Sequence, residues 1–375
     1  MSKCDQVFHT SIMQLPVSTY FDDFLYQKEL DYLFSIGPKY IGHELMIPNI
    51  GNYHTLQYEE NARMIINDNH EINLVSNVCR HRQALILQGF GTTQNIVCPL
   101  HLWTYEKSGE LISAPHFETK PCLNLNKYSI YSSNGMIFEG DIKHKIIEDL
   151  NHILKNNKHL QKFNFEEYRF HSSKIHECNY NWKTFIEVYL EDYHVNSFHP
   201  GLGNFVNCDN LEWQFSTDYS IQTVGIKNFL HTYGSKIYKD WHTQVLNFAQ
   251  NIENLPKYGA IWLTYYPNIM VEWYPYCLVI SILHPNSAKN TKNVVEFYYP
   301  EEIALFEPDF ISAHQAAYME TYIEDDEIAI RMEKGRKALY LKNINEYGPY
   351  QSPMEDGMRH FHEWYRKNIK FEGSL

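Results

Sequence analysis

Short apolar runs separated by glycines dominate residues 41 to about 140, and this pattern predicts short β-strands. Asn134-Gly135 within this stretch is a strong hairpin signal, because both residues tolerate the positive φ angles of a two-residue turn. A second hairpin is expected between the apolar runs Ala84–Leu87 and Ile96–Val97, which a glycine-containing stretch separates. This part of the chain therefore reads as an all-β domain.

Helical periodicity frames this β-rich stretch on both sides. Upstream, an amphipathic segment covers Phe21–Ile36. Downstream, residues 143–163 are rich in lysine, and their apolar positions recur at the spacing of a helix. We interpret residues 143–163 as a boundary helix or linker. The predicted organisation is an N-terminal segment at 1–40 that packs on the C-terminal domain, a β-domain at 41–142 and a larger domain at 143–375.

The C-terminal region mixes helices and strands. Asn181–His194 has helical periodicity, whereas residues 259–299 hold alternating or continuous apolar runs separated by turns. Phe310–Lys337 has the pattern of a long, charge-rich helix, and a second helical stretch is expected around residues 360–366. The expected fold class is α+β, with an N-terminal all-β domain and an antiparallel sheet covered by helices in the C-terminal domain.

The composition of the chain limits the kinds of partner that it is expected to bind. The chain has 375 residues, enough for two domains, and a net charge of −13 that disfavours nucleic acid. We expect no membrane partner, because no run reaches the ~18 apolar residues of a membrane span. No secretory segment is visible, and the seven cysteines are odd in number and mostly scattered, so a cytoplasmic location is expected.

Cys79 and His81, followed by Cys98 and His101, form the most informative motif. Two thiolates and two imidazoles can hold a [2Fe–2S] cluster with two cysteines on one iron and two histidines on the other. The alternative is a structural zinc site, since two Cys and two His also bind zinc. Each half-site here mixes one Cys with one His, which favours the iron–sulfur cluster.

A second candidate site lies around His194 and His199, with Glu191 three residues before the first histidine. Two histidines and one carboxylate on one face of a metal make the facial triad of non-haem Fe(II) oxygenases, which leaves positions open for O2 and substrate. Two histidines five residues apart are also explained by a hydrogen-bonded or surface pair, so the spacing alone leaves both interpretations open.

Taken together, the two motifs resemble those of the alpha subunit of Rieske non-haem iron (ring-hydroxylating) oxygenases. The sequence C-x-H-x16-C-x-x-H, followed by Leu-Trp-Thr-Tyr, resembles the Rieske domain of that family. N-W-K-T-F-I-E-V-Y-L-E-D-Y-H-V-N-S-F-H resembles its catalytic motif. Gln83 and Leu102 depart from the family, which usually has glycine at both positions.

The resemblance implies the site residues. The cluster would be held by Cys79, His81, Cys98 and His101, and the mononuclear iron by His194, His199 and a downstream aspartate. Counting back from Gly335 in E-T-Y-I-E-D-D-E-I-A-I-R-M-E-K-G, Asp325 takes the aspartate position, with Asp326 as the alternative one residue away. Glu333 stands where the family commonly has glutamine.

Glu191 receives a role from the same resemblance. In the family an acidic residue at this position connects a catalytic histidine of one subunit to a cluster histidine of its neighbour. A glutamate there is more similar to the choline and carnitine monooxygenase branch than to the aromatic-ring dioxygenases, which typically carry aspartate.

The resemblance therefore implies a terminal oxygenase. It would use O2 and electrons from a separate reductase or ferredoxin to hydroxylate or demethylate a small organic substrate, with a quaternary amine as the first candidate. A homotrimer is the usual assembly of the family. Two alternatives are kept: an aromatic-ring dihydroxylating dioxygenase or aromatic O-demethylase, and a Rieske electron carrier without catalysis.

Overall fold

The computed structural model describes residues 13–69, 71–141, 143–156, 160, 165–227 and 233–369. They divide into two compact units, one within residues 1–37 and 171–375 and the other within residues 38–170. We call them the α+β unit and the β-unit. None of the described helices combines the length and apolar character that a membrane crossing requires.

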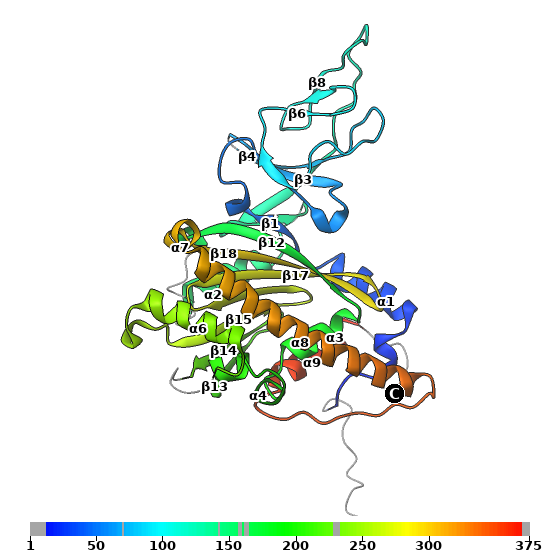
Figure 1. Cartoon of the computed structure of the whole chain (residues 1–375). Helices are drawn as coiled ribbons and strands as arrows, with labels where there is room; N and C mark the ends of the chain where they lie inside the picture. The colour runs from blue at the N-terminus through cyan, green and yellow to red at the C-terminus, as the bar shows by residue number, and fades with distance from the viewer. Residues whose placement is uncertain are drawn as a thin grey trace, which may run out of the picture. The chain divides into compact units, whose positions relative to one another are not determined.

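The β-unit contains three small antiparallel sheets (Figure 1). In sheet order they are β1 (Lys39–His43), β11 (Met136–Glu139) and β10 (Ile130–Ser133); β5 (Phe90–Thr92), β2 (Asn52–Thr55), β3 (Arg63–Asp68), β4 (Glu71–Ser76) and β9 (Lys127–Tyr128); and β6 (Ile96–Val97), β7 (Thr104–Tyr105) and β8 (Leu111–Ser113). Short 3-10 turns lie at Glu44–Met46, Gln57–Glu59 and Phe165–Glu167. The all-β prediction for this region is confirmed.

The two predicted hairpins have different outcomes. Asn134 and Gly135 connect β10 to β11 with φ angles of 52° and 79°, as the hairpin signal requires. The hairpin between Ala84–Leu87 and Ile96–Val97 is wrong. Phe90–Thr92 instead pairs with Asn52–Thr55, far away in sequence, because long-range backbone pairing overrides the local pattern.

Helix α2 (Ile146–Asn156) belongs to the β-unit. Its Asn151 accepts a 3.0 Å hydrogen bond from the side chain of Asn134 in the β10–β11 turn. Just before the helix, the backbone N–H of His144 donates to the Tyr131 hydroxyl. These contacts hold residues 143–156 to the β10–β11 hairpin. Residues 143–156 thus lie in the β-unit, which ends at residue 170, and the boundary expected at 142/143 stays a prediction.

The α+β unit is built on one seven-stranded antiparallel sheet. Its strands, in sheet order, are β12 (Tyr168–Cys178), β18 (Asn290–Pro300), β17 (Cys277–Ser287), β16 (Ile269–Tyr274), β15 (Tyr258–Tyr265), β14 (Tyr219–Ile226) and β13 (Val206–Phe215). Four of them confirm the strands expected at 259–299. Strands β17 and β18 extend into the polar stretch expected to be a turn, because backbone pairing continues to Ser287 and Asn290.

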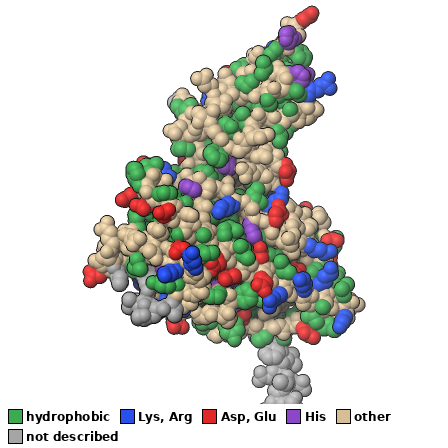
Figure 2. All heavy atoms as spheres, viewed as in Figure 1, with side chains coloured by type: hydrophobic (Ala, Val, Ile, Leu, Met, Phe, Trp, Pro, Cys, Tyr) green, Lys and Arg blue, Asp and Glu red, His purple; other side chains and the backbone are tan. Residues whose placement is uncertain are grey.

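Helices cover this sheet. They are α1 (Asp23–Glu29), α3 (Trp182–Tyr189), α4 (Val195–Phe198), α5 (Leu202–Phe205), α6 (Lys236–Ala249), α7 (Glu301–Phe306), α8 (Pro308–Tyr340) and α9 (Asp356–Asn368), with 3-10 turns at Val17–Tyr20 and Ile252–Asn254 and a π-helical turn at Leu30–Phe34. Figure 1 shows α8 running across the sheet. Charged side chains gather over its outer face (Figure 2), among them the exposed Glu327, Arg331 and Lys337.

Candidate metal centres

The four Cys and His residues of the β-unit divide into an inner and an outer pair. Cys79 and Cys98 are buried, with exposed fractions of 2% and 1%, in the apolar core formed with Trp103. His101 is exposed, and His81 is partly exposed. The two imidazole rings lie 4.6 Å apart between centroids.

Two tight turns position these side chains. The N–H of Gln83 donates to the Cys79 carbonyl, and the N–H of Leu102 donates to the Cys98 carbonyl, each at 3.0 Å. Gln83 and Leu102 have φ angles of 56° and 60°, in the left-handed region that favours glycine. These are the two positions at which the family usually has glycine. The turns keep their form, at a cost of about 1–2 kcal/mol for each residue.

The donor set fits a Rieske cluster. Cys98 has a raised thiol pKa, because burial disfavours the thiolate and the adjacent Cys79 thiol adds to the rise, so a bound cation would favour its ionisation. His81 Nδ1 is buried without a hydrogen-bond partner among the described residues. The His81 ring is held by stacking on Trp103, with a centroid distance of 5.0 Å and an interplanar angle of 4°. Inner thiols and outer imidazoles match the two ends of such a cluster.

In the α+β unit, three separate elements supply a second donor set. Helix α3 starts at the cap residue Asn181 and ends at Tyr189, before the expected end at His194. His194 then caps the short helix α4, and His199 follows that helix. Asp325 comes from the middle of α8. The helix predicted up to His194 therefore ends at Tyr189, and a turn separates it from α4.

The three side chains converge on one point. His194 Nε2 and His199 Nε2 are 2.9 Å apart, and Asp325 Oδ1 lies 2.9 Å from His199 Nε2 and 3.4 Å from His194 Nε2. Three atoms with these separations can all lie about 2 Å from a single metal ion, the usual distance for nitrogen and oxygen ligands. Asp325 Oδ1 is buried and accepts no well-oriented hydrogen bond.

Two carboxylates contact the Nδ1 atoms of the two histidines and orient their rings. His194 Nδ1 contacts Glu191 closely, and His199 Nδ1 lies 2.7 Å from Glu324 Oε2. When both Nδ1 atoms donate to carboxylates, both Nε2 lone pairs face the shared point, as in many metal sites. Burial alone would lower the pKa of His194, but Asp325 and Glu191 raise it to about 10. The negative surroundings therefore favour a cation at this point, and the set fits a facial-triad metal.

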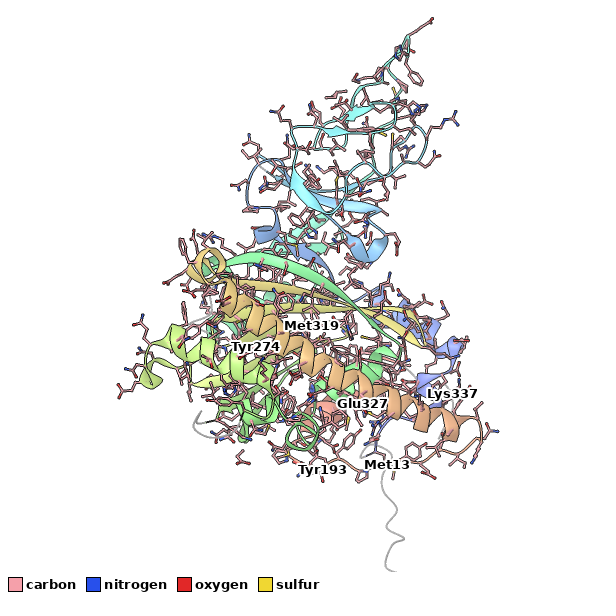
Figure 3. The ribbon with its side chains drawn as sticks, viewed as in Figure 1. Met13, Tyr193, Tyr274, Met319, Glu327 and Lys337 are labelled. Atoms are coloured by element: carbon pink, nitrogen blue, oxygen red, sulfur yellow. The ribbon has the colours of Figure 1, made fainter. Side chains whose placement is uncertain are left out.

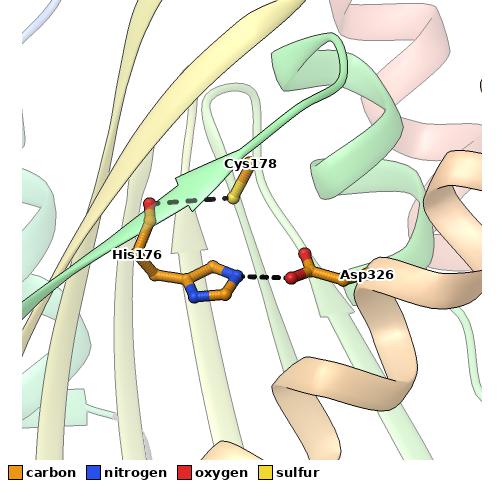
Figure 4. Close-up of side chains that lie close together, drawn as sticks. All are labelled: His176, Cys178 and Asp326. Carbon is orange, nitrogen blue, oxygen red and sulfur yellow. Dashed lines mark hydrogen bonds and ion pairs between the residues drawn. The ribbon is translucent and has the colours of Figure 1, made fainter.

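Asp326 turns away from this point. Its Oδ2 lies 2.7 Å from His176 Nε2 on β12 (Figure 4). Its Oδ1 accepts a 2.7 Å hydrogen bond from the Tyr180 hydroxyl. Cys178 lies close enough to complete a second possible ligand set. Because both carboxylate oxygens of Asp326 already have partners, this set is a satisfied hydrogen-bond network. Geometry favours Asp325 over its neighbour as the ligand.

A cavity of about 80 Å³ adjoins the His194–His199–Asp325 point. Strand β16 contributes Tyr274 to its lining (Figure 3), and helix α8 contributes residues that include Tyr318. Tyr189 and Trp262 line the cavity, whereas Tyr193 is 61% exposed.

Sequence reasoning missed two carboxylates here. Glu324 lies in the acidic run I-E-D-D-E, and nothing in the sequence distinguishes it from Glu327. Glu272 was not considered. The sequence could have identified Glu272 as a candidate, because it is the one charged residue in the otherwise apolar or aromatic run I-M-V-E-W-Y.

Comparison with known proteins places both units in families. The chain matches the model of the Rieske [2Fe-2S] domain at residues 39–129 and that of the ring hydroxylating alpha subunit (catalytic domain) at residues 165–370. It is 56% identical over 358 residues to the putrescine 2-hydroxylase of Ralstonia nicotianae, covering 96% of each chain. It is 24% identical over 366 residues to the chloroplastic choline monooxygenase of Spinacia oleracea, covering 95% of this chain and 78% of the relative.

A solved structure shares the fold. The structure of a quaternary ammonium Rieske monooxygenase, linked to carnitine oxidation by gut microbiota, superposes with a TM-score of 0.76 at 17% identity. The alignment covers 96% of both chains. This likeness confirms the expected fold class of a Rieske domain joined to a helix-covered antiparallel sheet.

Proposed function

The chain belongs to the family of Rieske non-haem iron oxygenases with a ring-hydroxylating alpha subunit, and from this premise we propose that it hydroxylates a short aliphatic diamine. As a member of that family it is an oxidoreductase that takes electrons from a reductase or ferredoxin. Its cofactors, a [2Fe–2S] cluster and a mononuclear iron, supply single electrons and the activation of O2 when bound.

One observation carries the substrate proposal. The 56% identical relative is named for the 2-hydroxylation of putrescine, a four-carbon diamine, and the match covers nearly the whole of both chains. The quaternary ammonium monooxygenases are far more distant, at 24% identity or less for those compared above. We therefore place a primary diamine ahead of the quaternary amine that the sequence first suggested.

The ligand assignments are part of the proposal. Convergence of donor atoms supports iron at one site, and the inner thiol pair with its outer imidazole pair supports the cluster at the other. The proposed ligands are His194, His199 and Asp325 for the mononuclear iron and Cys79, His81, Cys98 and His101 for the cluster.

We propose a trimer in which Glu191 connects the two metal sites of neighbouring subunits. Its carboxylate already contacts His194 Nδ1, so it can hold that ring while accepting a second hydrogen bond. Around the cluster ligands, His101 is exposed and its neighbours Leu100 and Leu102 are 55% and 59% exposed, which suits a surface that docks on another protein. The related quaternary ammonium monooxygenase is described as transferring electrons between subunits.

Product analysis tests the proposed reaction. The reconstituted enzyme, with a reductase and ¹⁸O2, is expected to convert 1,4-diaminobutane to a hydroxylated diamine that carries one ¹⁸O atom. Choline, carnitine and an aromatic acid serve as comparison substrates. Oxygenation of one of these without oxygenation of any diamine would reject the diamine proposal.

A separate experiment tests the role of Glu191. Glu191→Ala is expected to keep the cluster spectrum and the iron content but to lose turnover driven by the reductase. Glu327→Ala, on the exposed side of α8, is the matched control. Light scattering measures the trimer, and a monomer that turns over normally would reject transfer between subunits.

A further inference from the structure

Glu272 is a buried carboxylate in the wall of the cavity. Its residue is 1% exposed and lies on the central strand β16. Its Oε2 accepts a 2.6 Å hydrogen bond from Tyr274, and its Oε1 accepts bonds from Tyr318 at 3.0 Å and Ser281 at 3.2 Å. All three donors are neutral hydroxyl groups. They orient the carboxylate without balancing its charge.

Among the described residues, no Lys, Arg or charged His balances Glu272. His314 also lines the cavity, but burial lowers its pKa to about 3, so its ring stays neutral. Burial raises the pKa of Glu272 to about 7, which shows that ionisation is costly without a cation. An uncompensated buried carboxylate of this kind is rare unless it meets a ligand or a metal.

Other buried glutamates of the same unit show the contrast. Glu187 is 1% exposed and forms ion pairs with Arg336 and His362. Burial alone would raise the pKa of Glu187, but Arg336 and His362 hold it at about 2. Glu29 is likewise paired with Lys183 at 2.6 Å. Glu187 and Glu29 thus each contact a cationic side chain, whereas the described residues place none beside Glu272.

The position of Glu272 relative to the candidate iron suits an elongated substrate. One face of α8 lines the cavity through His314, Ala317, Tyr318, Thr321, Tyr322 and Asp325. Tyr318, which donates to Glu272, is seven residues before Asp325. This separation is two helical turns, or about 10 Å along the helix. The cavity therefore has the candidate metal point and the carboxylate at different levels along α8.

Aromatic side chains complete the wall around Glu272. Tyr189, Trp262, Tyr274 and Tyr322 line the same cavity. Their ring faces attract a cation and exclude water, which strengthens a charge pair formed inside. A primary ammonium group also brings three N–H donors, which match a carboxylate better than the donor-free head of a quaternary amine.

Resting on the proposed diamine hydroxylation, we propose that Glu272 binds the ammonium group of the substrate that lies farther from the iron. The pair formed by this carboxylate and the ammonium fixes the substrate along the cavity, so that an interior carbon is presented to the iron site. Selectivity for primary amines over quaternary amines then follows from the same residue.

Anaerobic titration calorimetry on the holoenzyme tests this assignment with 1,4-diaminobutane and butylamine as ligands. Glu272→Gln keeps the size of the side chain and removes its charge. It is expected to weaken binding of both amines by roughly 100-fold. Glu302→Gln, an exposed change on α7, is the control and is expected to bind as the wild type does.

Further readouts separate binding from a structural role. In Glu272→Gln, the iron content and cluster spectrum should match the wild type, and the substrate-free melting temperature at pH 8 should not fall, because no ion pair is lost. Glu272→Asp keeps the charge but shortens the side chain by one methylene group. It is expected to recover part of the affinity and to favour 1,5-diaminopentane over 1,4-diaminobutane.

The possible outcomes separate this assignment from the proposed reaction. Equal amine affinity, within about threefold, in wild type and Glu272→Gln would overturn the role of Glu272, even if the diamine is hydroxylated. If amines bind through Glu272 but no diamine is oxygenated, the binding assignment stands and the proposed reaction fails. If the wild type binds no primary amine, the assignment is wrong.

Discussion

Helix α8 carries two neighbouring aspartates whose surroundings differ. Asp325 faces the cavity, where its Oδ1 meets two histidine nitrogens and no well-oriented donor. Asp326 faces β12, where His176 and Tyr180 satisfy both of its oxygens. On the cavity side of α8, a carboxylate oxygen thus lacks a well-oriented donor among the described residues. On the β12 side, both carboxylate oxygens have partners. Unmatched buried groups indicate where a ligand belongs.

Glu272 extends the contrast to the strand opposite α8. Glu272 also presents a carboxylate to the cavity, but no Lys, Arg or charged His among the described residues lies beside it, whereas two histidines face Asp325. The cavity would thus hold two different ligands, a metal ion at Asp325 and an ammonium group at Glu272. Substitutions at these and neighbouring carboxylates distinguish the two.

The largest effect is expected from Asp325→Ala. The two histidines alone should not retain the mononuclear iron, so iron should fall from about three to about two atoms per chain while the cluster remains. Turnover should fall by about 1000-fold or more. Iron and sulfide assays with EPR of the reduced protein measure this, and Glu327→Ala is the control. An unchanged iron content would remove Asp325 from the site.

Glu324→Gln should have a smaller effect on the same metal. Glu324 Oε2 lies 2.7 Å from His199 Nδ1, so the change weakens the group that orients this ring. Such partners typically contribute about 10–100-fold to metal affinity. Competition with a chelator during Fe(II) loading measures the change. Wild-type affinity in this variant would show that the contact does not support the ligand.

Diamine affinity should depend on pH through Glu272. The carboxylate pairs with an ammonium only when ionised, and burial raises its pKa to about 7 in the free protein. Affinity should therefore rise with pH up to about 7 and level off above it, with a loss of up to about tenfold for each unit below. The substrate ammonium stays protonated throughout this range.

Most of the other groups around Glu272 do not reproduce this profile. Burial keeps the surrounding phenols and imidazole neutral near pH 7, namely Tyr189, Tyr274, Tyr318, Tyr322 and His314. Asp192 also lines the cavity, and burial raises its pKa to about 7. Glu272→Gln separates the two carboxylates. If the pH profile persists in that variant, Asp192 is responsible and the prediction is wrong.

Asp326→Asn should have the smallest effect on the chemistry. It removes a charge that His176 and Tyr180 stabilise, so we expect a loss of about 1–3 kcal/mol in stability, seen as a lower melting temperature. Iron content and turnover should stay within about threefold of the wild type. Loss of iron without loss of stability would reverse the comparison between the two aspartates.

The sequence was most informative where the ligands lie close together in the chain. Cys79 to His101 span one local motif, and the family, fold class, enzyme class and cofactors expected from the motifs are confirmed. The individual ligand residues stay a prediction. Gln83 and Leu102 looked like departures, and the structure shows that they adopt left-handed backbone angles without glycine.

What the sequence could not predict depends on tertiary contacts. Phe90–Thr92 pairs with a strand about forty residues away, which no local pattern encodes. Glu324 supports His199 because the fold brings α8 beside the residue that follows α4, and the acidic run around Glu324 gives no sign of this role. The proposed role of Glu272 is visible only in the structure, where no cationic side chain among the described residues lies beside it.

The most direct test is a crystal structure of the holoenzyme with 1,4-diaminobutane, measured with anomalous diffraction at the iron edge. The account predicts an iron peak between His194, His199 and Asp325, and an amine nitrogen within hydrogen-bond distance of Glu272. An iron peak at His176, Cys178 and Asp326 would contradict it. So would a diamine bound with neither nitrogen near Glu272.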